Sequence, residues 1–189
     1  ALSLMIKFTS DTYLHISIEG ASLKVFMWAF GLYLIIGFSI TAGYHRLFSH
    51  KSYQGSTFVK FIFLVFGAAA FQNSALKWCR DHRLHHQHCD HDEDPYSIKK
   101  GFWYAHIGWI FYQEETEDFS NVKDLKRDPL VVWQDKYIFT IGAIVGIFIP
   151  ILIGVWMGYP LGGIGLIAFG RIFFLHHMTF FINSLCHMV

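Results

Sequence analysis

Apolar residues fall into four blocks of about twenty residues each, and the segments between them carry most of the charge. The blocks cover residues 23–43, 57–76, 137–158 and 161–182, and a polar segment, 77–136, separates the second from the third. About 20 apolar residues in a helix match the ~30 Å hydrocarbon core of a bilayer. The pattern predicts an all-α integral membrane protein with a polar cap.

The remaining segments complete this division of the chain. Residues 1–22 are ambiguous, and we interpret them as the remnant of an earlier span plus a short loop. Gly158-Tyr159-Pro160 is a turn signal, so the third and fourth blocks are expected to form a spanning hairpin. The sequence starts without Met and ends in an apolar run, so we interpret residues 1–189 as one domain truncated at both ends.

Composition and charge exclude some classes of function. The chain is 53% hydrophobic with a formal net charge of +1, which does not point to a nucleic-acid partner. Its three cysteines have no paired spacing, which argues against a disulfide framework and indicates a reducing side of the membrane. The N-terminal residues carry charges and no small-residue cleavage site, so they do not read as a secretory signal.

Histidines form two candidate groups around the second block. His82, His85 and His86 are spaced i, i+3, i+4, so on a helix they share one face, with Cβ atoms ~5–6 Å apart. His45 and His50 are five residues apart, which does not fit one face of a single α-helix, so we expect the helix to end or turn between them. A solvated histidine-rich loop and an interfacial histidine pair are the plainer alternatives.

A third polar group lies at the exit of the fourth block. Asn183 and His187 are spaced i, i+4, and Thr179 and His176 continue the same face. A polar stripe on a membrane helix is costly unless it faces a cavity or partners. Hydrogen bonding between helices is the alternative to a site.

The ligand type limits the metal. An imidazole-rich site without thiolate pairs suits Zn, Cu, Fe or Ni. Six candidate histidines from three segments exceed the needs of one structural zinc. Two adjacent metals, most economically iron, would use them, and an iron pair in an apolar setting suits dioxygen chemistry on an unactivated C–H bond.

Sharing a metal constrains the topology. If block 57–76 crossed the bilayer, ~30 Å of hydrocarbon would separate His45 and His50 from the histidines after it. Metal–imidazole bonds are only ~2 Å long. This block is therefore expected to lie in the interface, which leaves three spans. The basic residues then gather on the histidine side, which reads as cytoplasmic.

Three of these segments resemble the motifs of a known family. His45-Arg46-Leu47-Phe48-Ser49-His50, His82-Arg83-Leu84-His85-His86 and Asn183-Ser184-Leu185-Cys186-His187 are similar to the histidine boxes and Asn/His helix of membrane acyl desaturases, the Δ9 or stearoyl-CoA desaturase-like family. The likeness extends through Phe71-Gln72-Asn73, Trp78 and His106-Ile107-Gly108-Trp109. It covers about residues 30–112 and 165–189.

The resemblance implies a non-haem enzyme with two Fe2+ ions. It would use O2 and two electrons to insert a cis double bond, at Δ9, into a saturated acyl chain. The intact family has four spans and a cytosolic helical cap that carries the di-iron site. The implied iron ligands are His45, His50, His82, His85, His86 and His187, with Asn183 acting through water. The implied substrate-binding residues are Gln72, Asn73, Trp78, Arg80 and Thr179.

Two departures affect these expectations. The family's third box, HxxHH, is absent from the 189 residues, so we expect this chain by itself to hold iron poorly and to be inactive. Gln113 and Glu114 stand where the animal acyl-CoA enzymes have a basic pair that contacts CoA. The substrate is therefore expected to be acyl-CoA or acyl-lipid, with acyl-carrier-protein open.

The resemblance also implies partners and a location. No fused cytochrome b5-like domain lies within these residues, so a separate donor, ferredoxin or cytochrome b5 in type, is expected. The location would be the bacterial inner membrane or the endoplasmic reticulum, with the active site on the cytoplasmic face and membrane lipid around the spans. A related di-iron hydroxylase or ketolase and a non-catalytic metal-binding membrane protein or transporter remain alternatives.

Overall fold

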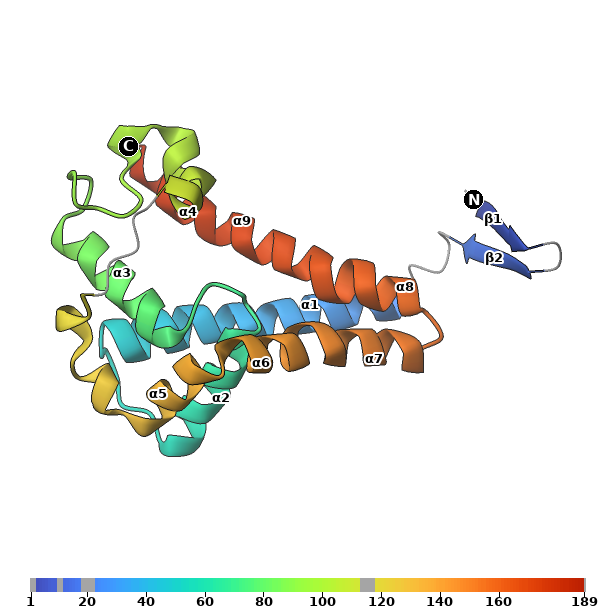
Figure 1. The fold of residues 1–189 in the computed structure, drawn as a ribbon, viewed down its shortest axis with the longest axis horizontal. Helices are drawn as coiled ribbons and strands as arrows, with labels where there is room; N and C mark the ends of the chain where they lie inside the picture. Colours follow the sequence, from blue (N-terminus) through green and yellow to red (C-terminus); the bar gives the residue numbers. More distant parts are fainter. Residues whose placement is uncertain (1–2, 10–11, 18–22, 113–117, 189) are drawn as a thin grey trace.

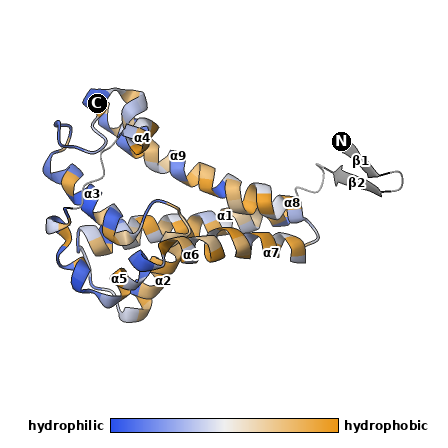
Figure 2. Cartoon of the chain, in the orientation of Figure 1, coloured by the Kyte–Doolittle hydropathy of each residue, from blue (hydrophilic) through white to orange (hydrophobic). Residues whose placement is uncertain are grey.

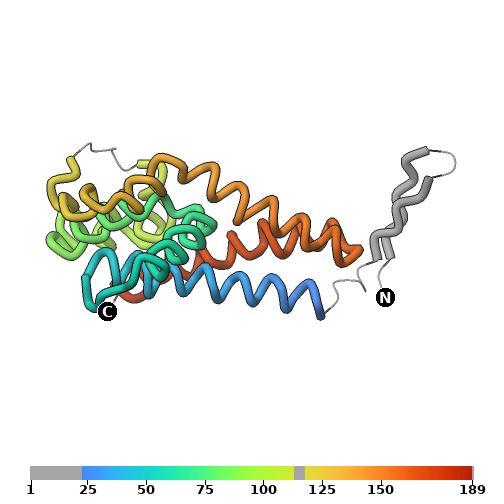
Figure 3. The backbone as a smooth tube through the Cα atoms, turned by 90° about the horizontal axis from the view of Figure 1, so that it is seen from below, coloured from blue at the N-terminus to red at the C-terminus, as the bar shows by residue number. Residues whose placement is uncertain are grey.

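Three long helical runs lie side by side in the computed structural model, which describes residues 3–9, 12–17, 23–112 and 118–188 (Figure 1, Figure 3). The runs are Leu23–Ser49, Ile138–Trp156 and Pro160–His187, and each is long and apolar enough to cross a membrane. They contain 27, 19 and 28 residues, or roughly 40, 28 and 42 Å at 1.5 Å per residue. Most of their length is coloured as hydrophobic in Figure 2, and their length and composition confirm the three expected spans.

Each run alternates between α and π geometry. The first joins α1 (Leu23–Phe38) to the π-helix η2 (Ser39–Ser49). The second joins α6 (Ile138–Ala143), η7 (Ile144–Phe148) and α7 (Ile149–Trp156). The third joins α8 (Pro160–Gly162), η8 (Gly163–Gly170), α9 (Arg171–Ser184) and η9 (Leu185–His187). At the tight connection between the last two runs, a Cβ on Gly154 would stand 2.5 Å from the Cα of Gly163, so the backbones touch directly.

Shorter helices cap one end of the long ones, and this end is the more hydrophilic part of Figure 2. α2 has only 12 residues, roughly 18 Å, which is too short to cross ~30 Å of hydrocarbon. A buried turn follows it, and α3 begins at Ala75. The cap consists of α2 (Thr57–Ala68), α3 (Ala75–Gln87), η3 (Ile98–Lys100), η4 (Tyr104–Gly108), α4 (Trp109–Tyr112), η5 (Ser120–Val122), η6 (Leu125–Arg127) and α5 (Pro129–Lys136).

A buried polar side chain joins the cap to the first long helix. Gln134 of α5 donates to the hydroxyl of Tyr44 at 2.5 Å and to the carbonyl of Leu64 at 3.3 Å. Its side-chain oxygen accepts from the backbone N–H of Ala75 at 3.0 Å. Gln134 and Tyr44 are fully buried, so these bonds satisfy groups that would otherwise be costly to bury. One side chain thus fixes α2 and α3 relative to η2.

The N-terminal residues differ from the expected remnant of a span. β1 (Ser3–Thr9) and β2 (Thr12–Ser17) form an antiparallel hairpin that pairs Ser3 with Ser17 and Thr9 with Thr12. The two segments have 7 and 6 residues, which is strand length and far short of a spanning helix. The all-α prediction is confirmed for the described residues from Leu23 onward.

Candidate metal centre

Four histidines converge where η2 meets α3. The Nε2 atom of His50 lies 3.1 Å from that of His45 and 3.0 Å from that of His82. The Nε2 atoms of His82 and His86 are 3.1 Å apart. The four ligand atoms all lie within 4.8 Å of one another. The two histidine groups that the sequence placed on either side of block 57–76 therefore form one cluster.

The spacing within this cluster fits a shared ion. Two imidazole nitrogens that are each ~2.1 Å from one ion and at right angles to each other lie about 3 Å apart. The measured separations of neighbouring Nε2 atoms, 3.0 to 3.1 Å, match this value. The residues present therefore fit a metal ion bound through imidazole nitrogens.

The helix end expected between His45 and His50 is found at Ser49, with His50 as the C-cap residue, but the helix up to that point is not an α-helix. η2 continues through Ser49 as a π-helix, and the backbone N–H of His50 donates to the carbonyl of His45 at 3.0 Å. A π-helix bonds residue i+5 to residue i, so residues five apart stack on one face. The geometry of the helix, rather than its end, brings the two imidazoles together.

A second cluster contains His85, Cys89 and His187, whose ligand atoms also lie within 4.8 Å of one another. His85 donates from Nδ1 to the carboxylate of Asp94 at 2.8 Å, which leaves its Nε2 free to bind a metal. The Sγ of Cys89 lies 3.9 Å from the Nδ1 of His187, and that nitrogen is 3.2 Å from the carboxylate of Asp90. The sequence identified His85 and His187 but missed Cys89, because a lone cysteine carries no spacing signal.

The two clusters adjoin each other. The ring centroids of His85 and His86 are 5.4 Å apart, and those of His85 and His187 are 5.0 Å apart. The three histidines of α3 serve both clusters, His82 and His86 on one side and His85 on the other. All six histidines expected as ligands thus gather at one place, in an arrangement that suits two neighbouring ions.

Burial keeps the imidazoles of His82 and His86 in the neutral form that binds metals. It lowers the pKa of His82 to about 2, with the neighbouring imidazoles of His45, His86 and His50 as further causes. Burial likewise lowers the pKa of His86, again with nearby imidazoles adding to the effect. Both rings are therefore neutral at physiological pH, and no proton has to leave before a metal binds.

Asp94 is the carboxylate that lies behind His85. It is 1% exposed and accepts hydrogen bonds from His85, from the backbone N–H of Asp90 at 2.8 Å and from that of Tyr96 at 3.1 Å. Burial disfavours its charge, but these bonds outweigh burial and hold the pKa of Asp94 below its usual range. An ionised Asp94 fixes the ring orientation of His85, as carboxylates behind metal-bound histidines do.

Arg83 is a site residue that the sequence did not single out. It lies on α3 between the metal-facing histidines and donates to the carbonyls of Phe48 at 2.8 Å and Ser49 at 3.1 Å. It also donates to the carbonyl of Asn121 at 2.7 Å and to the carboxylate of Asp124 at 2.8 Å. Arg83 thus fixes the end of η2, which carries His45 and His50, against α3. Only long-range contacts reveal this role.

Of the expected substrate-binding residues, Trp78 is the one that the structure brings into contact with a histidine of the centre. Gln72 donates from Nε2 to the hydroxyl of Thr179 at 2.9 Å, which joins the turn after α2 to α9. Trp78 stacks on His82, with ring centroids 4.7 Å apart. Arg80 is 5% exposed and hydrogen-bonded to Asp81, and Asn73 is an exposed residue with a φ of 69°. Their substrate-binding roles stay predictions.

Two other expectations have different outcomes. Asn183 lies on α9 one turn before His187, and its role as a ligand through water stays a prediction. Gln113 and Glu114 lie outside the described residues, as do Glu115 and Glu117, the next acidic residues of the chain.

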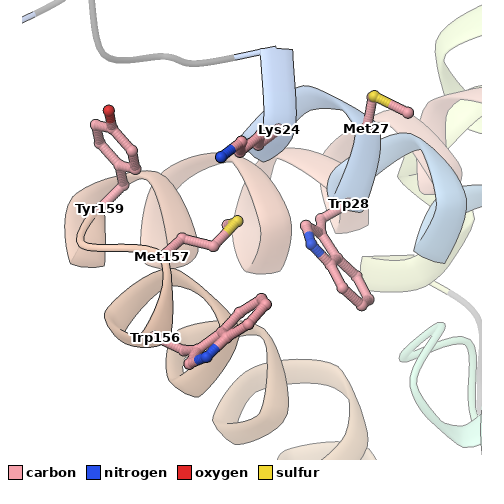
Figure 4. A pocket seen from close by; sticks show the side chains of 6 residues that line it. All are labelled: Lys24, Met27, Trp28, Trp156, Met157 and Tyr159. Carbon is pink, nitrogen blue, oxygen red and sulfur yellow. The ribbon is translucent and has the colours of Figure 1, made fainter.

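A hollow of about 850 Å³ lies at the other end of the long helices, away from the histidines (Figure 4). Lys24, Met27, Trp28, Trp156, Met157 and Tyr159 line it. Aromatic residues and a lysine at helix ends are typical of the membrane–water interface. The hollow therefore has the side chains of a membrane–water interface, and none of the candidate ligands lines it.

A family model for fatty acid desaturases matches residues 25–188 of this chain. The chain belongs to the fatty acid desaturase family. The match covers both histidine clusters, which agrees with the metal dependence and the membrane location of the family. The recognition made from the histidine boxes is confirmed.

Curated relatives support the same assignment. The chain is 40% identical over 169 residues to a probable acyl-CoA desaturase of Schizosaccharomyces pombe, covering 88% of this chain and 35% of the relative. It is 34% identical over 194 residues to a Delta(9)-fatty-acid desaturase of Caenorhabditis elegans, covering 99% and 57%. It is 39% identical over 173 residues to an sn-2 palmitoyl-lipid 9-desaturase of a Nostoc strain, covering 88% and 57%. The chain thus spans between about a third and somewhat over half of the length of these relatives.

Proposed function

We propose that this chain carries the metal-binding core of an O2-dependent acyl desaturase that inserts a cis double bond, at Δ9, into a saturated acyl chain. The observation that carries the proposal is the convergence of six histidines, from η2, α3 and η9, into two adjoining clusters at one end of membrane-length helices. The overall reaction removes two hydrogen atoms from the chain. With O2, two electrons and two protons it yields the alkene and two molecules of water.

Two Fe2+ ions fit these clusters by donor type, because imidazole suits iron and the site has few thiolates. When bound, the ions would supply the activation of O2 and the oxidising power for an unactivated C–H bond. His45, His50, His82 and His86 would hold one ion, and His85 and His187 the other. Asp94 orients His85, and Arg83 holds η2 against α3, so the chain itself fixes the relative positions of the two sites.

We further propose that the acyl chain bends beside the hydrogen-bonded pair Gln72 and Thr179 and the ring of Trp78. The contact of Trp78 with His82 supports a bend close to the metal-binding rings. The position of the bend would decide which methylene groups face the ions. The curated relatives are named both as acyl-CoA and as lipid-linked desaturases, so the acyl carrier is proposed as CoA or a lipid.

The orientation follows from charge. Basic residues concentrate at the histidine end. The first apolar block, residues 23–43, has Lys24 as its one charged residue, and Lys24 lies at the end of the block that is away from the histidines. The positive-inside rule therefore supports a cytoplasmic site. Electrons would come from a separate ferredoxin or cytochrome b5 donor that reaches the same face.

The experiment that tests this function is expression of the full-length protein in a desaturase-deficient host with fatty-acid profiling. We expect a new cis monounsaturated acid with the wild-type protein and none with His85→Ala, because that variant loses a ligand and its hydrogen bond to Asp94. His88→Ala, which alters a histidine outside both clusters, is the matched control and should keep the product. An iron-loaded wild-type protein that makes no unsaturated product would overturn the proposal.

A further inference from the structure

The turn between α2 and α3 is buried, and its backbone needs partners from elsewhere. Ala69 and Ala70 have no exposed surface. Phe71 and Asn73 have φ values of 55° and 69°, a left-handed backbone that non-glycine residues adopt at a cost. Gln72, which carries the proposed bend, lies between these two residues. Something must therefore hold the turn in this conformation.

Three side chains of α9 contact three successive parts of the turn. Arg171 donates from Nη1 to the carbonyl of Ala69 at 3.1 Å. His176 donates from Nε2 to the carbonyl of Ala70 at 2.7 Å. Thr179 accepts from the side chain of Gln72 at 2.9 Å. The carbonyls of Ala69 and Ala70, which directly follow α2, are thereby satisfied.

Arg171 is suited to this position although it is a charged residue in a spanning helix. It is 2% exposed, and it also donates to the carbonyls of Gly146 at 2.9 Å and Ile167 at 3.2 Å. Both carbonyls belong to π-helical segments. A cation at the C-terminal end of α2 is also favoured by the helix dipole. The guanidinium therefore joins α2 to two of the three spans.

The second span holds the turn from the other side. A Cβ on Gly146 would stand 2.6 Å from the ring of Phe71, so only glycine leaves room for that ring. The turn is thus held by hydrogen bonds from α9 and by packing against η7. Gln72, between the two, has a buried Oε1 that receives no hydrogen bond within the described part of the chain.

We propose that Arg171 and His176 are positioning residues that hold the turn and thereby determine where along the acyl chain the double bond is inserted. The proposal rests on the desaturase function proposed above. Neither side chain is a candidate metal ligand or a proposed substrate contact. Their effect on the product would pass through the backbone of the turn to Gln72.

The test replaces His176 in the full-length protein and measures the double-bond position by mass spectrometry. Leucine at this site removes the donor to Ala70, whereas glutamine can restore it. We expect His176→Leu to raise the share of misplaced double bonds about three- to tenfold and His176→Gln to stay near the wild type. Met178→Leu, an exposed position on the same helix, is the control. Arg171→Met, when the variant protein folds, should likewise raise the share of misplaced double bonds.

Hydrogen–deuterium exchange gives a readout that does not depend on activity. Amides of residues 69–76 should exchange faster in purified His176→Leu than in His176→Gln. Faster exchange together with a changed product position supports the proposal. Unchanged exchange, or a lower yield with the same double-bond position in both variants, overturns it. A wild-type protein that makes no unsaturated product would overturn the desaturase function instead, while the exchange data would still report on the turn.

Discussion

Replacing Asp94 by asparagine tests whether the carboxylate behind His85 organises the second cluster. Asp94 accepts three hydrogen bonds, from the Nδ1–H of His85 and from two backbone N–H groups. Asparagine keeps the shape but has one acceptor oxygen and an NH2 group that cannot accept. It therefore loses the charge beside His85 and turns a donor toward at least one N–H group.

Carboxylates behind metal-bound histidines typically contribute 10–100-fold in affinity. We therefore expect Asp94→Asn to weaken Co2+ or Fe2+ binding by about 10–100-fold, or ~1.4–2.7 kcal/mol. One unpaired buried N–H should also lower the free energy of unfolding by about 1–3 kcal/mol. Chelator competition on the detergent-purified full-length protein measures the affinity, and metal-free thermal unfolding measures the stability. Asp92→Asn, an exposed change in the same loop, is the control. Wild-type affinity in Asp94→Asn would refute the orienting role.

Three further predictions concern the surroundings of the centre. Burial disfavours the charge of Asp124, but hydrogen bonds from Arg83 and Lys51 outweigh burial and hold the pKa of Asp124 below its usual range. The ionised carboxylate therefore stabilises the fold above about pH 4, and this stabilisation is lost progressively as the pH falls further. Between about pH 6 and pH 3 the melting temperature should fall less steeply in Asp124→Asn than in the wild type, and equal slopes would contradict the pairing. Cobalt bound to the wild-type protein should show near-ultraviolet thiolate-to-metal absorption that Cys89→Ser loses while it still binds cobalt; a wild-type spectrum without that band would remove Cys89 from the ligands. In a double-mutant cycle on thermal stability, Gln72→Leu and Thr179→Val should couple by about 0.6 kcal/mol, up to ~1.7, whereas additive effects would deny their hydrogen bond a role.

The helical body and the shared face of His82, His85 and His86 could be predicted because both depend on short-range periodicity. Apolar blocks of spanning length indicated three helices, and the i, i+3, i+4 spacing indicated the shared face of α3. The bond length of a metal then linked segments far apart in sequence, since His50 and His82 can share an ion only if α2 does not cross the bilayer. The length of a metal–imidazole bond thus took the place of contact information.

Contacts that have no periodicity were not predictable in this way. Arg83, Arg171 and Gln134 each bond to carbonyls or side chains of distant elements, and the sequence around each of them looks like an ordinary helix. Cys89 and Asp90 reach the second cluster through a turn whose path depends on Asp94. In each case tertiary packing determines the partner, and no local sequence pattern predicts it.

The π geometry of η2 is the feature that the spacing of His45 and His50 did not predict. At 100° per residue in an α-helix, five residues turn through 500°, which leaves His45 and His50 about 140° apart around the axis. The same spacing in a π-helix places them one hydrogen-bonded turn apart, and their Nε2 atoms meet at 3.1 Å. The spacing of five residues between His45 and His50 is therefore matched to π geometry, whereas the spacings of three and four residues from His82 to His85 and His86 are matched to α geometry. The two spacings identify two kinds of helix that present imidazoles to a common centre.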